Sequence, residues 1–110
     1  MSESTKLMRI TRAEFGEGGY QDACIGFSLT FETEGAGVSD FKGTWNMEPS
    51  QYAAWTVADQ DAEFAKTVRL IADTLRAAKK RYVSELKGVP VEVTFEGNVL
   101  KSWRILTEVL

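Results

Sequence analysis

Histidine is absent from the sequence, which removes the commonest general base and the commonest ligand of transition metals. Nucleophile pairs of the Ser-His and Cys-His kind are excluded for the same reason. Cys24 is the only cysteine, so neither an internal disulfide nor a cysteine-rich metal cluster can form. It lies in mid-strand without an activating partner, and we expect an unreactive thiol. We therefore expect no catalytic residue, no metal and no cofactor.

Long apolar runs are also missing. No stretch approaches the roughly 18 apolar residues of a membrane-spanning helix, and the opening "MSESTKLMRI" lacks the apolar core of a signal peptide. We expect a cytoplasmic protein that does not bind membranes. The chain has 110 residues, of which 44% are hydrophobic and only two are prolines, and this predicts a single folded domain over residues 1–110.

Acidic and glycine-rich segments are present, but none has the spacing of a known site. The carboxylate clusters lack the pattern of a calcium loop, and we interpret them as helix-start acids and solvated strand edges. The string "GEGGY" fits neither phosphate-loop signature and predicts a turn. The clusters are Glu32/Glu34, Asp59/Asp61/Glu63 and Glu92/Glu96.

Strict alternation of apolar and polar residues from Ala23 to Phe31 predicts a half-buried strand. A shorter strand is expected over Lys6–Phe15, before this segment, and another near Val38–Asn46, after the turn "ETEGAG". Together they predict a three-stranded antiparallel meander in the N-terminal half.

A long amphipathic helix is expected from Asp61, because apolar residues then recur at steps of three and four. Gly88 and Pro90 would end it. The segment before it, "MEPSQYAAWTVADQ", predicts a short helix or a turn. The stripe expected to face the core comprises Phe64, Val68, Ile71, Leu75, Ala78, Tyr82 and Leu86.

The C-terminal segment predicts a hairpin around Gly97-Asn98. An odd-length loop would place Val93 opposite Trp103 and would keep apolar side chains on one face, so we favour it over a two-residue loop. The predicted fold class is therefore α+β: an antiparallel sheet, made of the N-terminal meander and the C-terminal hairpin, packed on one long helix with a short helix before it.

Two groups of residues are candidates for a binding surface. Residues 61–110 carry 9 Lys/Arg against 7 Asp/Glu, whereas residues 1–60 carry 4 against 9. Basic residues on the polar face of the helix could bind phosphates, nucleic acid or an acidic partner, although a solvated face with Asp73 paired between arginines explains them too. Aromatic residues at the sheet-to-helix transition could anchor an interface or fill the core. The candidates are Lys66, Arg69, Arg76, Lys79 and Lys80, with Tyr52 and Trp55.

The ending "LKGVPVEVTFEGNVLKSWRILTEVL" and the opening "ITRAEFGEGGYQDACIGFSLTF" resemble small proteins encoded by tailed bacteriophages and prophages. This chain has Val89 where a lysine is commoner in such proteins, and the resemblance brings no catalytic residues. It implies stoichiometric binding, as anti-CRISPR proteins block a host effector and anti-defence sponges sequester signalling nucleotides.

These observations predict a non-enzymatic phage accessory protein that binds and sequesters a host defence protein or a small nucleotide. Two alternatives stay open: an OB-like single-stranded nucleic-acid-binding protein of phage DNA metabolism, and a small virion or assembly component. We also expect a homo-oligomer, because edge strands and a long amphipathic helix leave apolar surface to cover.

Overall fold

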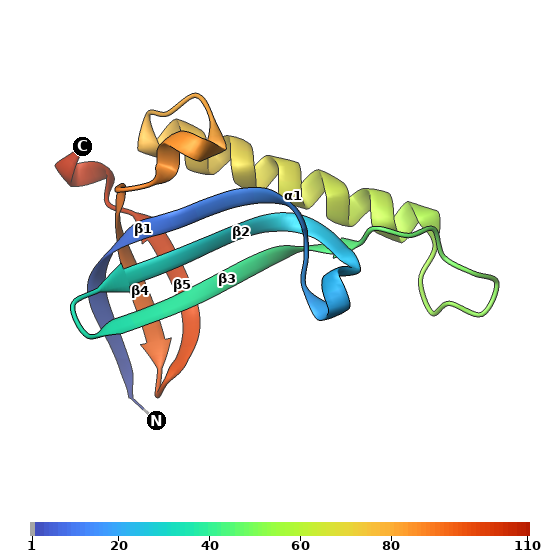
Figure 1. Cartoon of the computed structure of the whole chain (residues 1–110), viewed down its shortest axis with the longest axis horizontal. Helices are drawn as coiled ribbons and strands as arrows, with labels where there is room; N and C mark the ends of the chain where they lie inside the picture. Colours follow the sequence, from blue (N-terminus) through green and yellow to red (C-terminus); the bar gives the residue numbers. More distant parts are fainter. Residues whose placement is uncertain (1) are drawn as a thin grey trace.

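The computed structural model describes residues 2–110 and contains a five-stranded antiparallel sheet with one long helix, α1, beside it (Figure 1). The strand order is β3-β2-β1-β4-β5, so the meander and the C-terminal hairpin are joined through β1. The predicted α+β fold class is therefore confirmed. The elements are β1 (Glu3–Gly18), β2 (Cys24–Thr33), β3 (Ala36–Trp45), α1 (Val57–Ala78), β4 (Pro90–Glu96) and β5 (Val99–Ile105), with short 3-10 turns η1 (Tyr20–Asp22), η2 (Val83–Leu86) and η3 (Thr107–Val109).

Strand β1 pairs with both parts of the sheet. Its first half, Glu3–Arg9, pairs with β4, and its second half, Arg9–Gly18, pairs with β2, with a bulge between Ile10 and Arg12. Because a bulge increases the local twist, the hairpin β4–β5 crosses the meander at a steep angle (Figure 1). The sheet thus curls around its own core.

The core lies inside this curl. The predicted alternation in β2 is confirmed, since Phe27, Leu29 and Phe31 are all at most 1% exposed. Val93 lies opposite Trp103, whose ring centroid is 5.4 Å from that of Phe31. Trp103 Nε1 also donates a 2.9 Å hydrogen bond to Asp40 on β3, so a side-chain bond ties together the two outermost strands.

The hairpin has the predicted register, but a two-residue loop and a bulge produce it. Val93–Trp103 and Val91–Ile105 are paired as expected, but the loop between Glu96 and Val99 has two residues rather than an odd number. Lys101 lies unpaired in a bulge, which restores the parity that a two-residue loop would otherwise reverse. The prediction of an odd loop is therefore wrong.

Helix α1 begins and ends earlier than expected. A capping box between Thr56 and Asp59 starts it, and residues 47–55 before it form turns, so the short helix is absent from the described chain. It ends at Ala78, because Lys79 adopts the left-handed conformation with φ 59° and its N–H turns back to the carbonyl of Arg76. Tyr82 and Leu86 consequently lie outside the helix, at η2.

The face that α1 turns toward the sheet matches the predicted stripe only in part: Ile71 and Leu75 pack against the core and Ala78 is buried in it. Gln60, Thr67 and Thr74 are buried, whereas Val68 is 58% exposed. The buried polar groups have partners: the threonine hydroxyls donate to carbonyls one turn earlier, and Gln60 Nε2 donates to the carbonyls of Trp45 and Met47. Small threonines let the helix approach the sheet without losing hydrogen bonds, and the apolar stripe is rotated partly into solvent.

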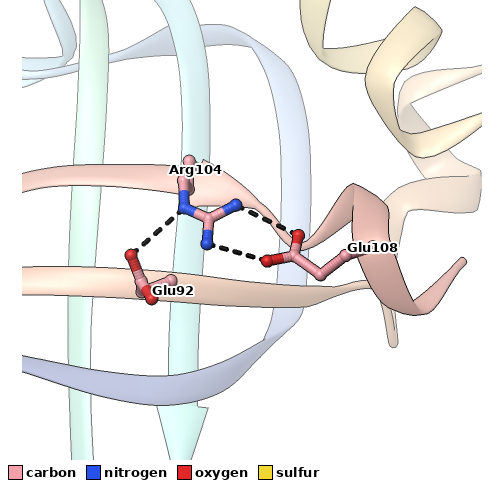
Figure 2. A network of polar contacts seen from close by, with 3 residues as sticks. All are labelled: Glu92, Arg104 and Glu108. Carbon is pink, nitrogen blue, oxygen red and sulfur yellow. Dashed lines mark hydrogen bonds and ion pairs between the residues drawn. The ribbon is translucent and has the colours of Figure 1, made fainter.

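An ion-pair network holds the chain end. Arg104 on β5 donates to Glu92 on β4 and, through both terminal nitrogens, to Glu108 in η3 (Figure 2). The hydrogen bonds from Arg104 lower the pKa of Glu108 to about 2, so the Glu108 carboxylate is ionised at neutral pH. Within residues 2–110, no helix is both long and apolar enough to cross a membrane.

Candidate functional site

The predicted basic stripe on α1 is exposed, but two of its charges are already offset. Lys66 Nζ lies 3.0 Å from a carboxylate oxygen of Glu63, and Arg76 lies 3.3 Å from Asp73. These are i,i+3 pairs within one helix face, as a solvated face would show. Asp73 pairs with Arg76 rather than lying between two arginines.

A denser basic group follows the end of α1. We define the basic turn as Lys79, Lys80, Arg81 and Lys87, all of which are exposed. Within residues 2–110, no carboxylate oxygen lies within 4.0 Å of their side-chain nitrogens. A further cation borders the group, because Arg9 on β1 donates a 2.9 Å hydrogen bond to the carbonyl of Gly88.

Glu85 is the acidic residue within the segment 79–88, and its carboxylate accepts hydrogen bonds from the backbone. One oxygen accepts hydrogen bonds from the N–H groups of Arg81, at 2.9 Å, and Tyr82, at 3.1 Å. These two bonds, and then the charges of Lys80 and Arg81, lower the pKa of Glu85. Glu85 therefore fixes the backbone conformation of the turn. Most of the positive charge of the basic turn remains available to a partner.

Tyr82 adds an aromatic surface to the basic turn. Its side chain is 60% exposed, and the guanidinium carbon of Arg81 lies 5.8 Å from the ring centroid. That spacing is typical of a cation–π contact. Cations beside an exposed ring can bind a phosphate while the ring stacks on a base.

Part of this clustering has a structural reason. The C-terminal end of a helix attracts cations, which accounts for Lys79 and Lys80 at the end of α1. The effect falls off within about one turn. Lys87 lies well beyond that range along the chain, since α1 ends at Ala78, so the helix dipole does not explain the whole group.

The two predicted aromatic residues lie at the opposite end of α1. Tyr52 is 87% exposed in the turn before the helix, and Trp55 is half-buried. A helix of 22 residues spans about 33 Å, so these side chains and the basic turn do not form one small-molecule site. The structure thus separates the candidates into an aromatic end and a basic end.

A cleft that the sequence reasoning missed lies between β3, β5 and α1. It has a volume of about 390 Å³, and Asp40, Lys42, Thr74, Lys101 and Trp103 are among its lining residues. The alternation in β3 could have indicated this cleft. Asp40 and Lys42 lie on the same face as Val38, and these three residues are the cross-strand partners of the core residues of β2. The cleft carries both signs of charge, and Asp40 lies 3.6 Å from Lys42, so it is less suited to an anion than the basic turn.

Comparisons with known proteins found no relative: no family model, curated protein or solved structure matches the chain.

Proposed function

We propose that this chain is a non-enzymatic phage accessory protein that captures an anionic partner at the basic turn. The partner is a small signalling nucleotide or an acidic surface of a host defence protein. The observation that supports this proposal is the exposed group of four cations without a carboxylate within 4.0 Å in residues 2–110.

The chemistry of the basic turn favours binding over catalysis. Lysine and arginine form short, charge-assisted hydrogen bonds to phosphate and carboxylate oxygens. Glu85, the carboxylate nearby, has a lowered pKa and remains ionised at neutral pH, so it is poorly suited to donating a proton. Fixed positive charge also speeds the approach of an anion and makes its affinity sensitive to salt.

Single-stranded nucleic acid is the second candidate partner, and the strand order favours it. A five-stranded antiparallel sheet with β1 shared between two halves, and a helix between β3 and β4, is similar to the partly open barrel of OB folds. The likeness is one of arrangement alone. The exposed ring of Tyr82 among cations would suit a stacked base.

The test compares two double charge reversals that change the net charge equally. Lys80→Glu with Arg81→Glu alters the basic turn, and Arg69→Glu with Arg76→Glu alters the helix stripe. The readouts are fluorescence anisotropy with a labelled cyclic dinucleotide and with labelled oligothymidylate, together with capture of host proteins from a bacterial lysate. We expect binding to be lost in the basic-turn variant and retained in the stripe variant.

The pattern of binding separates the two candidates. Retention of the dinucleotide or of a defined host protein supports sequestration. Affinity for oligothymidylate that falls steeply with salt supports nucleic-acid binding, because neutralised phosphates release counterions. Unchanged binding of every partner after reversal of Lys80 and Arg81 refutes both uses of the basic turn.

A further inference from the structure

An apolar surface remains uncovered where α1 lies near Phe15 of β1 and Ile25 of β2. Val68 is 58% exposed and Phe15 is 50% exposed. With Ile25, Phe64 and Thr67 they line a shallow hollow of about 290 Å³, whose lining is almost entirely apolar. Contiguous apolar surface of this kind marks a contact with another molecule more often than does a single exposed side chain.

The backbone beside this hollow is also uncovered. The segment Arg12–Gly18 of β1 pairs with β2 on one side, and the pairing of β1 with β4 is confined to Glu3–Arg9. Within residues 2–110, therefore, no strand pairs with the second edge of Arg12–Gly18. Exposed strand edges are usually covered or shortened in stable proteins. Phe15 belongs to this segment and also lines the hollow, so the unpaired edge lies beside the apolar surface.

The charges along this side of α1 are self-complementary. Asp61, Val68 and Leu75 recur every seven residues, so they share one side of α1, along which Leu75 is partly buried against the core. Lys79 follows directly after the last helical residue and places a cation at that end of α1. Asp61 at one end and Lys79 at the other are exposed, and neither has an ion-pair partner within 4.0 Å in residues 2–110. Two such helices placed antiparallel bring each acidic end against the other's basic end.

We propose that a second copy of this chain covers the surface, with the two α1 helices antiparallel about a two-fold axis near residue 70. Asp61 of each copy then lies opposite Lys79 of the other, and Val68 lies opposite Ala72. A two-fold contact uses the same patch on both copies, as this charge pattern requires. Lys79 belongs to both the contact and the basic turn, whereas Lys80, Arg81 and Lys87 stay outside the contact and remain free for an anion in the dimer.

The first test is the oligomeric state, measured by sedimentation velocity from micromolar to hundreds of micromolar protein. We expect a concentration-dependent dimer that Val68→Glu converts to monomer by burying a charge in the contact. Ala62→Glu is the matched control, because it adds the same charge at an exposed position on another side of α1. A wild-type monomer at every concentration overturns the proposal and leaves the surface to a different partner.

Charge exchange tests the antiparallel arrangement itself. Asp61→Lys alone and Lys79→Asp alone should each raise the dimer dissociation constant by about tenfold, since like charges then face each other at both ends. Aspartate tolerates the left-handed backbone of residue 79, so Lys79→Asp should fold normally. An equimolar mixture of the two variants should form a heterodimer at wild-type concentrations. Failure of the mixture to associate overturns the proposed arrangement.

Discussion

The bond between Trp103 and Asp40 offers the sharpest test of how the curled sheet is closed. It joins β5 to β3, the two outermost strands, at 2.9 Å, and the Asp40 side chain is only 14% exposed. Trp103→Phe retains an aromatic ring against Phe31 but removes the donor. A hydrogen bond to a charged group contributes about 1.5–3 kcal/mol, and the smaller ring should cost about 1 kcal/mol more.

We therefore expect Trp103→Phe to lower the free energy of unfolding by about 2.5 to 4 kcal/mol in urea denaturation. A double-mutant cycle with Asp40→Ala isolates the bond from the ring-size effect. The cycle should give a coupling energy of about 1.5 kcal/mol or more. Additive effects of the two substitutions would refute the idea that this bond closes the sheet.

Three further predictions follow from the packing and charges. Gly26→Ala should lower stability by about 1–3 kcal/mol, since a Cβ there would overlap the Lys42 carbonyl, whereas Gly16→Ala, with nothing within 4 Å, should melt near the wild-type temperature. Thr74→Val should leave the urea midpoint unchanged or raise it, because its hydroxyl only duplicates a helix hydrogen bond; a large loss would contradict the proposed helix packing. Glu108 has a pKa lowered to about 2, so its stabilising effect should be complete above its ordinary pKa and fade as pH falls toward 2; Glu108→Gln should remove that part of the pH dependence of unfolding.

The sheet was predictable because burial on one face imposes a period of two. The alternation from Ala23 to Phe31 located β2, and parity fixed the pairing of Val93 with Trp103. The bulge at Lys101 was not predictable, because a bulge and an odd loop give the same parity.

The helix was harder to predict because propensity and periodicity say little about a side chain's partners. Thr67 and Thr74 are polar in sequence yet buried, since each finds a carbonyl within its own helix. The end of α1 at Ala78 was missed because Lys79, a residue other than glycine, adopts the left-handed conformation. As a result, part of the expected apolar stripe, namely Val68 and Tyr82, is exposed.

The candidate binding residues were found only in part. Lys79 and Lys80 belong to the basic turn, but Arg81 and Lys87 join them only because the helix ends early and the chain turns at η2. Tyr52 and Trp55 precede the start of α1, so they lie at the opposite end of the helix from the basic turn. Ion pairing of Lys66 and Arg76 depends on rotamers that the sequence does not reveal.

The central claim is that an anionic partner binds the basic turn, and a residue-resolved NMR titration tests it most directly. Uniformly ¹⁵N-labelled protein is titrated with a cyclic dinucleotide and, separately, with oligothymidylate. We predict amide shift changes concentrated over residues 79–88 and at Arg9, which borders this segment through Gly88. Changes centred on residues 52–55 or on the cleft between β3 and β5, or no changes with either ligand, would contradict the claim.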